Sequence, residues 1–310
     1  KVIGRDDHPG ILLLQDAPQR LARKLDDIFD KDILALRRFG DRAVVFDAAS
    51  LTMPYWLLTF DELVEVLFPG RAGYESEIEI LSDLIPQAKK INLSNASGGV
   101  RLLAERRLSD QTSITVDTPV PYRISEILSL IDKTLGALDA TRSNAPYKRL
   151  RTRLYAVSQD SRYAFMFGNL TVQDTMARFL GQLFRIPVEG RPVSIIELGG
   201  LPVEIAQVVV SVIARLAFEF GMWSNGTAPV ALVCEDAHRY APARDAEGFG
   251  PTRRALVRLA KEGRKVGVSL WVVSQRPTEL DPTVLSQCNT IFALRLSNNE
   301  DQEFLSGATS

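Results

Sequence analysis

Cysteine and histidine are scarce in this sequence, with two residues of each type among 310. Two cysteines cannot form a disulfide framework, and Cys234 and Cys288 do not have the paired spacing of a zinc site. A histidine-based metal centre is disfavoured for the same reason. The sequence therefore argues against chemistry that depends on thiols or on imidazole ligands.

An excess of charge of either sign is also missing. Lysine and arginine number 37, aspartate and glutamate number 38, and the formal net charge is −1. A protein that attracts nucleic acid through its overall field is usually basic. Any contact with nucleic acid must therefore come from a local patch, such as the lining of a ring.

The chain has no long apolar run. No apolar stretch approaches the roughly 18 residues of a membrane-spanning helix, and no signal peptide is visible. With 45% hydrophobic and 24% charged residues, the composition is that of a soluble globular chain that can bury one large core and a subdomain. We expect a cytoplasmic protein without a membrane partner.

The dipeptide Gly-Lys does not occur anywhere in the sequence. A phosphate-binding loop has the pattern G-x-x-x-x-G-K-[ST], in which backbone amides and the lysine wrap the β- and γ-phosphates of a nucleotide. We expect that such a loop, if the protein binds a nucleotide, lies outside these residues in a longer polypeptide. A relative that has no such loop is the alternative.

What the sequence does contain is an apolar run that ends abruptly in two acids. Residues 230–234, VALVC, are β-prone and are followed by Glu235 and Asp236. A Walker B segment has this form, because a buried parallel strand delivers one acid to Mg²⁺, mostly through water, and a second acid to the attacking water. We predict Glu235 as the Mg²⁺ ligand and Asp236 as the acid that positions water. A solvated turn is the alternative, and His238 is taken as a structural histidine.

A second apolar run, residues 266–273, ends in the polar segment SQRP, which contains Gln275. Ligands of an open α/β sheet bind outside the carboxyl ends of the strands. Gln275 is therefore expected beside Glu235 if the two strands are neighbours. An amide there would sense a γ-phosphate or hold a water molecule, and the alternative is an amide that only caps a turn.

The segment between these strands is basic. Residues 252–265, TRRALVRLAKEGRK, carry six cations and one anion. Arg254, Arg258, Lys261 and Lys265 fall on one face of a helix by their spacing. A solvated face is the usual interpretation of such a pattern. Here Arg264 is also expected at the edge of the sheet, from which a neighbouring subunit could be reached.

Four segments in this order resemble the HerA family: MPYWLLTFDELVEVL, CEDAHRY, EGRKVGVSLWVVSQRP and VLSQCNTIFALRLSNNEDQ. Members of that family are hexameric, FtsK-like, DNA-translocating ATPases built on a RecA-type core. The resemblance is strongest over residues 229–304 and reaches back in patches to about residue 43. It implies ATP and Mg²⁺ as cofactors, with Glu235 and Gln275 at the nucleotide, and double-stranded DNA as a partner that is bound without regard to sequence.

The resemblance also implies roles for single residues. An arginine near the position of Arg264 acts in trans in this family, as arginine fingers do. Lys265 is the weaker candidate because a point charge lacks the bidentate fork. Asp236 stands where the family more often has glutamate, and its shorter side chain requires a shifted water or a more closed interface. Nothing in the chain resembles the family's β-barrel.

The apolar runs predict an α/β fold, namely a RecA-like, mostly parallel sheet that is flanked by helices and interrupted by a helical bundle. The core is expected in residues 1–59 and 188–310, and the mainly helical insertion in residues 60–187. Pro86 is expected to end or kink a helix. Strands are predicted at residues 11–14, 43–46, 193–198, 230–234, 266–273 and 290–296, and helices at residues 74–93, 123–138, 147–157 and 171–186.

We therefore expect the ATPase core of a HerA-like DNA translocase or helicase, working as a homo-hexameric ring around double-stranded DNA. In this family the motor works with a nuclease (NurA-like) in the end processing of DNA repair, or with a nuclease or sirtuin-like NADase effector in antiphage defence. Two alternatives stay open: a non-hydrolysing scaffold that lacks a P-loop, and an ATPase motor for conjugative DNA or protein transfer.

Overall fold

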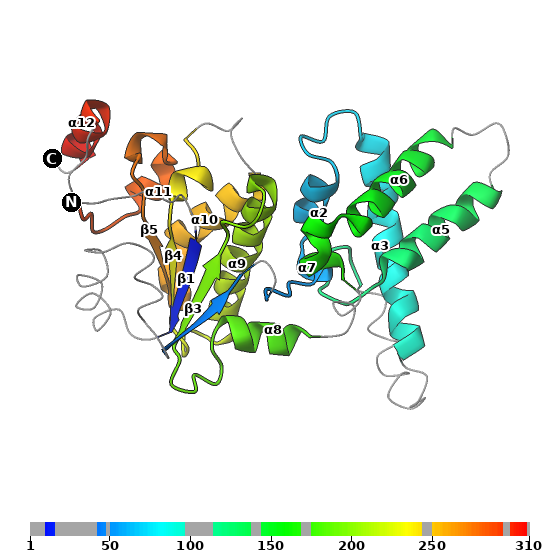
Figure 1. The fold of residues 1–310 in the computed structure, drawn as a ribbon, viewed down its shortest axis with the longest axis horizontal. Coiled ribbons are helices and arrows are strands. Elements are labelled where there is room, and N and C mark those ends of the chain that lie inside the picture. Colours follow the sequence, from blue (N-terminus) through cyan, green and yellow to red (C-terminus); the bar gives the residue numbers. More distant parts are fainter. Residues whose placement is uncertain are drawn as a thin grey trace. The chain divides into compact units, whose positions relative to one another are not determined.

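The computed structural model describes residues 10–15, 42–47, 50–96, 114–137, 144–168, 175–243, 250–293 and 298–308. Its internal contacts divide the chain into two units, which are coloured by sequence in Figure 1. The first unit comprises residues 1–51 and 178–310, and the second comprises residues 52–177. The boundaries expected from the sequence lie after residues 59 and 187, several residues later in the chain.

A five-stranded sheet forms the centre of the first unit, with the strand order β2-β3-β1-β4-β5. The pairs β2–β3 and β4–β5 are parallel, whereas β1 is antiparallel to both β3 and β4. Four strands therefore point in the same direction, as predicted for a mostly parallel sheet, and β1 alone is reversed. The strands are β1 (Gly10–Gln15), β2 (Ala43–Phe46), β3 (Val193–Glu197), β4 (Val230–Cys234) and β5 (Val268–Val272).

The central strands β3 and β4 are buried on both of their faces, and their sequences show why. β3 is buried at four of five positions and β4 at all five, so neither strand alternates between core and solvent. Continuous apolar runs are typical of strands that bury both faces. Val193, Ile195, Ala231 and Val233 form one apolar cluster, with the half-buried Trp271 packed against it.

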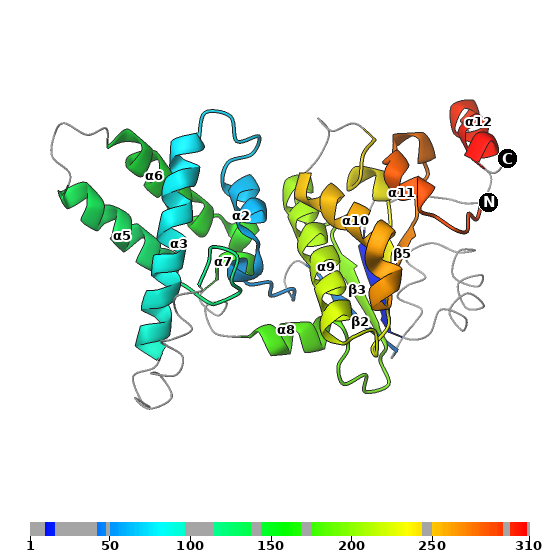
Figure 2. The same cartoon turned by 180° about the vertical axis from the view of Figure 1, so that it is seen from behind.

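Two long helices lie on the same face of this sheet (Figures 1 and 2). Helix α9 (Val203–Trp223) contacts α10 (Gly250–Glu262), β4 and β5. Gln207 of α9 fixes the helices to the loop beyond β4, because its side chain donates to the Arg239 carbonyl at 3.1 Å and its own carbonyl accepts from Thr252 Oγ1 at 2.7 Å. The remaining helices of this unit are α8 (Met176–Leu183), which spans the boundary between the units, η6 (Ala237–Arg239), η7 (Gly263–Val266), η8 (Pro277–Glu279), α11 (Pro282–Ser286) and α12 (Asn299–Ala308).

By length and composition alone, α9 is apolar enough to cross a membrane, with a mean hydropathy of 1.7 over its most apolar window. That window is 78% buried within the structure, which is the behaviour of a core helix. The expectation that no apolar segment reaches this length therefore needs correction. Charged residues such as Arg215 and Glu219 interrupt the apolar run, and they form an ion pair at 3.2 Å along the helix.

The turn between α10 and β5 depends on glycine. A Cβ on Gly263 would lie 2.7 Å from the Val268 carbonyl oxygen, which is closer than real contacts allow. Gly267, which ends the turn, has φ +77°, a left-handed conformation that glycine adopts without strain. Gly221 of α9 fits against the same turn, since its Cβ would meet the Val266 carbonyl oxygen at 2.6 Å.

The described part of the second unit is helical. Helix α2 (Phe60–Leu67) begins with a capping box, in which the Thr59 side chain accepts from the Glu62 amide and the Glu62 side chain accepts from the Thr59 amide. The long helix α3 packs against α5 and α6 (Figure 1). The helices of this unit are η2 (Tyr55–Leu57), α2, α3 (Glu75–Ala96), α5 (Ile124–Ala137), α6 (Ala145–Gln159), η4 (Ser161–Tyr163) and α7 (Ala164–Phe167).

A buried lysine ties this unit together. Lys89 of α3 is 2% exposed, and its ammonium donates to the carbonyls of Thr115, Val116 and Thr118 at 3.3, 2.6 and 2.6 Å. These bonds fasten the segment ahead of α5 to α3. Burial lowers the pKa of Lys89 to about 8, although the charge of Asp117 opposes this shift.

Four predicted elements differ from the structure, and one of them is the helix predicted over residues 171–186, which is observed as the shorter α8 (Met176–Leu183). Residues 290–293 form no strand, and residues 294–296 of that predicted strand lie outside the described residues. The predicted strand over residues 266–273 is shorter, because Val266 belongs to the glycine turn η7. Helix α3 continues past Pro86 for ten residues to Ala96, since its packing against α5 and α6 outweighs the backbone hydrogen bond that proline cannot make.

Candidate active site

The two predicted site strands are neighbours. β4 and β5 pair in parallel, with Cys234 opposite Val272. The pairing continues beyond the strand ends, because the Val273 amide donates to the Cys234 carbonyl at 2.9 Å and the Ala237 amide donates to the Val273 carbonyl at 3.0 Å. The segments that follow β4 and β5 therefore leave the sheet together at its carboxyl edge, as predicted.

Glu235 is the first residue after β4 and is half-buried. Burial and, to a smaller extent, the charge of Asp236 together raise the pKa of its carboxyl to about 8. These surroundings disfavour the charged form of the Glu235 carboxyl unless a cation lies beside it. A divalent metal or a guanidinium beside it would favour the charged form and reverse the shift.

Asp236 adopts an unusual backbone conformation. Its φ is 48° and its ψ is 43°, in the left-handed region, and it precedes the single turn of η6. Aspartate tolerates this region better than most residues, but such conformations gather at functional sites because the surrounding structure must hold them. The Asp236 side chain makes no capping hydrogen bond to η6, so its carboxylate is available at the strand end.

A side-chain contact joins the two loops that leave the sheet. His238 Nδ1 and Ser274 Oγ lie 3.0 Å apart, and Ser274 Oγ also accepts from the Arg276 amide at 3.0 Å. From the sequence alone, His238 is expected to be only a structural histidine. His238 follows the paired acids after β4, and Ser274 follows the end of β5. These matching positions in the sequence indicate that the two loops can be bridged.

Gln275 lies on this same edge and is exposed. It sits between Ser274, which contacts His238, and Arg276, whose guanidinium donates to Glu279 at 3.0 Å. Both of its neighbours are therefore held, while its amide faces solvent. The structure brings Gln275 to the same edge as Glu235 and Asp236, which is the placement that the spacing of the two motifs predicts.

A second layer of contacts supports the edge. The Asp281 carboxylate is fully buried and accepts from Arg253 of α10 at 2.5 Å and from the Thr283 amide at 2.7 Å. Burial alone would raise the pKa of Asp281, but these hydrogen bonds outweigh it and hold the pKa below its usual range. The Asp281 amide also donates to the Ala241 carbonyl at 2.8 Å. The loops after β4 and β5 therefore form one hydrogen-bonded frame with α10.

Arg264 lies at the opposite edge of the sheet. It belongs to η7, which directly precedes β5, whereas Glu235 follows the carboxyl end of β4. The five-residue strand β5 separates the two edges by roughly 17 Å, at about 3.3 Å per residue. Arg264 is exposed, and it cannot reach the Glu235 of its own chain. Only a second copy could bring the two residues together.

The basic face of α10 is shorter than predicted. The helix ends at Glu262, so Lys265 lies in η7 and not on the face of Arg254, Arg258 and Lys261. These three side chains are exposed. The Arg258 guanidinium also stacks 4.1 Å from the Phe218 ring centroid, which holds part of this face against α9.

The carboxyl edge fits a hydrated Mg²⁺ ion. Mg²⁺ keeps several waters and is bound in proteins by one or two carboxylates together with substrate phosphates, which matches the adjacent acids Glu235 and Asp236. Within the described residues, no group of three or more potential metal-binding side chains occurs. A metal here would therefore depend on phosphate oxygens for its remaining ligands. The sequence has no G-x-x-x-x-G-K-[ST] pattern to hold those phosphates.

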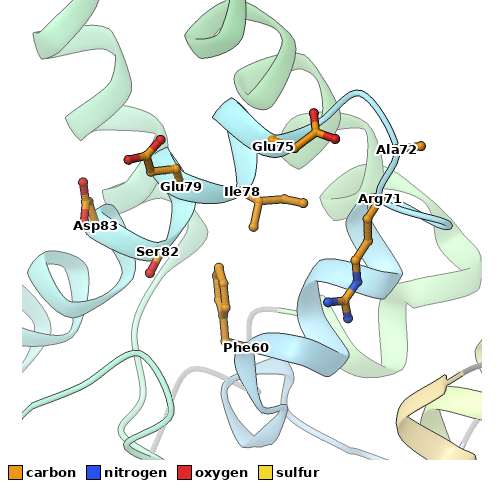
Figure 3. Close-up of a pocket in the computed structure, with 8 residues that line it drawn as sticks. All are labelled: Phe60, Arg71, Ala72, Glu75, Ile78, Glu79, Ser82 and Asp83. Carbon is orange, nitrogen blue, oxygen red and sulfur yellow. The ribbon is translucent and has the colours of Figure 1, made fainter.

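The second unit contains a shallow hollow of about 550 Å³ between α2 and the start of α3 (Figure 3). Phe60 and Ile78 point towards each other at its floor, and three acids of α3 line its rim. The one cation in its lining, Arg71, is paired with Asp61 at 2.5 Å and Glu65 at 3.1 Å. The lining carries no arrangement of a nucleophile and a base. The residues that line it are Phe60, Arg71, Ala72, Glu75, Ile78, Glu79, Ser82 and Asp83.

Comparisons with known proteins identify the family of the chain. The family model for the central domain of helicase HerA matches residues 27–217. The DNA double-strand break repair helicase HerA of Pyrococcus furiosus is 43% identical over 77 residues, which cover 25% of this chain and 13% of the relative. A probable helicase of Methanocaldococcus jannaschii is 46% identical over 79 residues, covering 25% and 14%.

The probable DNA double-strand break repair helicase HerA of Methanocaldococcus jannaschii is 42% identical over 83 residues, covering 27% of this chain and 16% of the relative. The matched segments thus span less than a fifth of the length of these relatives. The family model, by contrast, covers more than half of the 310 residues. The chain belongs to the HerA helicase family, whose central domain it contains.

Proposed function

We propose that this chain is the ATPase core of a motor that moves along double-stranded DNA as a homo-hexameric ring in the cytoplasm. The observation that carries the proposal is the division of the predicted site between two edges of one sheet. Glu235, Asp236 and Gln275 leave the carboxyl edge together, and Arg264 lies at the other edge. A site divided in this way is complete only where two copies meet.

The chemistry assigned to each residue follows from its position. ATP with Mg²⁺ supplies the phosphoanhydride whose hydrolysis drives movement. Glu235 holds the hydrated metal at the strand end, and Asp236 orients the attacking water and accepts its proton. Gln275 faces the γ-phosphate or holds the water in place. Arg264 of the adjacent copy stabilises the charge that develops on the transferred phosphoryl group, as an arginine finger does.

Movement along DNA would follow from changes at these interfaces. The contact between His238 and Ser274 joins the loop of the acids to the loop of Gln275, so a change at one loop is transmitted to the other. The chain carries a net charge of −1, so DNA contacts must come from local cations that face the phosphates. Readout of the base sequence is not required for such a motor.

The divided site can be tested by mixing two inactive variants of the intact protein. Arg264→Ala removes the finger and leaves the acids, and Asp236→Asn removes the acid and leaves the finger. In mixed rings, some interfaces pair an intact Asp236 with an intact Arg264. We therefore expect ATPase activity to be restored above that of either variant alone. Arg254→Ala, on the exposed face of α10, is the control and should keep its ATPase activity without any partner variant.

Mixed rings without any recovery would show that Arg264 does not complete a neighbour's site. The second candidate function is a non-hydrolysing scaffold that only organises partners. The two functions are separated by the wild-type intact protein itself, since a scaffold hydrolyses no ATP whatever its state of assembly.

A further inference from the structure

The hydroxyl of Tyr240 is buried and has no hydrogen-bond partner among the described residues. The residue follows η6 directly, four positions after Asp236, and its side chain is 2% exposed. Nearly all buried hydroxyls in proteins are paired, because an unpaired one loses its bonds to water without replacement. Tyr55, which is 1% exposed, shows the usual arrangement, since its hydroxyl donates to the Tyr122 carbonyl.

The groups around the Tyr240 hydroxyl are those of the candidate active site. Burial raises its pKa, and the neighbouring Cys234 thiol and the carboxylates of Asp236 and Glu235 raise it further. The Tyr240 hydroxyl therefore stays protonated and can act as a hydrogen-bond donor. The Asp236 carboxylate makes no capping bond to η6 either. Among the described residues, an unpaired donor and a carboxylate without a capping bond thus lie four residues apart across a single turn of helix.

We propose that Tyr240 is a positioning residue, whose hydroxyl donates a hydrogen bond to the Asp236 carboxylate when the nucleotide is bound. One carboxylate oxygen would accept from Tyr240, and the other would remain free to accept the proton of the attacking water. The inference rests on the proposed function. It accounts for an aspartate at this position, because a short carboxylate in a left-handed backbone needs a second contact to fix its orientation.

The test is Tyr240→Phe in the intact protein, which removes one oxygen atom and keeps the ring. We expect kcat for ATP hydrolysis to fall about tenfold or more while KM is unchanged, because the lost bond acts on the reacting geometry and not on binding. Affinity for Mg²⁺–ADP with aluminium fluoride, which imitates the transferred phosphoryl group, should fall by a similar factor. Affinity for Mg²⁺–ADP alone should stay the same.

Stability without nucleotide gives a readout that does not depend on activity. Removing an unpaired hydroxyl should leave the melting temperature of Tyr240→Phe unchanged or higher. Tyr55→Phe is the matched control and should melt lower, because its hydroxyl is paired. A Tyr240→Phe variant that melts lower and keeps its kcat would overturn the inference, since the hydroxyl would then be a structural one.

A double variant shows whether Tyr240 acts through Asp236. If it does, adding Tyr240→Phe to Asp236→Asn should lower the residual turnover no further. A second tenfold loss would overturn the proposed partnership. If the wild-type intact protein hydrolyses ATP and Tyr240→Phe matches it, this inference alone fails. If the wild type hydrolyses no ATP, the proposed function fails and the inference fails with it.

Discussion

At the scale of single residues, the paired acids after β4 are the most specific feature of the chain. Glu235 and Asp236 are adjacent in sequence, yet they differ in surroundings. Burial and a neighbouring charge raise the pKa of Glu235, whereas Asp236 is distinguished by its left-handed backbone. Two carboxyls in unlike environments are suited to unlike tasks, one beside a metal and one beside a water molecule.

Asp236→Asn in the intact protein should preserve ATP binding and lower turnover by roughly two orders of magnitude or more, the loss expected for a general base. Asparagine has the same shape, so the left-handed turn should be retained. Glu235→Gln should raise the Mg²⁺ concentration needed for half-maximal activity. Turnover and equilibrium binding of ATP measured over a Mg²⁺ series separate the two effects. Near-normal turnover in Asp236→Asn would make Asp236 a structural residue.

The buried Lys89 leads to a prediction about pH. Its pKa of about 8 in the folded chain lies below the 10.5 of a free lysine. Between these values the unfolded chain holds a proton that the folded chain has released, so the free energy of unfolding should rise with pH across this window. Below about pH 8 both states are protonated and this dependence vanishes.

The gain should be on the order of 1 to 3 kcal/mol between about pH 8 and pH 10.5, and it should be missing in Lys89→Met. Lys90→Met is the control, because Lys90 is the exposed neighbour. Urea unfolding at several pH values measures the effect. Lys89→Met should also be less stable at neutral pH, since three carbonyls lose their donor. Equal pH profiles for the wild type and Lys89→Met would contradict the assigned pKa.

At the scale of elements, the glycine turn η7 fixes the place of Arg264. Gly263→Ala would put a methyl group against the backbone at Val268, and backbone cannot move aside as a flexible side chain can. We expect a loss of about 1 to 3 kcal/mol in the free energy of unfolding and a displaced turn. Gly136→Ala in α5, where nothing lies within 4 Å of the added carbon, should have little effect or stabilise the chain. If Gly263→Ala and Gly136→Ala gave the same free energy of unfolding, the turn would not be rigid.

The elements also show what the sequence could predict. The strands at residues 43–46 and 230–234 were predicted with their observed limits, because apolar runs bounded by charges or turns leave little choice. The pairing of β4 with β5 followed from the order of the motifs. The start of β5 could not be predicted, since VGV is β-prone and only the close approach of α9 reveals the turn. The course of α3 past Pro86 depends on tertiary packing, which local propensity does not contain.

The same limit applies to the site. Motif spacing predicted that Glu235, Asp236 and Gln275 share an edge, because parallel neighbours place their carboxyl ends together. It could not predict the contact of His238 with Ser274 or the unpaired hydroxyl of Tyr240. Both features depend on the single helical turn η6, which begins after Asp236 in its left-handed conformation. The turn determines where the His238 and Tyr240 side chains lie.

At the scale of the whole molecule, the balance of charge determines how DNA can be held. A chain with a net charge of −1 produces no long-range attraction for a polyanion. Exposed cations are nevertheless gathered locally on α10 and η7, at Arg254, Lys261 and Lys265. In the proposed ring, this patch would be repeated once in each copy. The assembly would therefore contact more phosphates than a single copy could.

We therefore expect the affinity of the intact protein for duplex DNA to appear with assembly and to depend steeply on salt. The logarithm of the association constant should fall linearly with the logarithm of the salt concentration, with a slope of about −0.9 per phosphate neutralised. Two unrelated duplexes of equal length should give the same affinity and the same slope, because phosphate contacts carry no sequence information. Fluorescence anisotropy with size-separated fractions measures both quantities. Tight binding by the monomer would argue against the ring, because a chain without net positive charge needs many copies of a local patch to hold DNA. A marked preference between the duplexes would argue against binding through the phosphate backbone, because phosphates carry no sequence information.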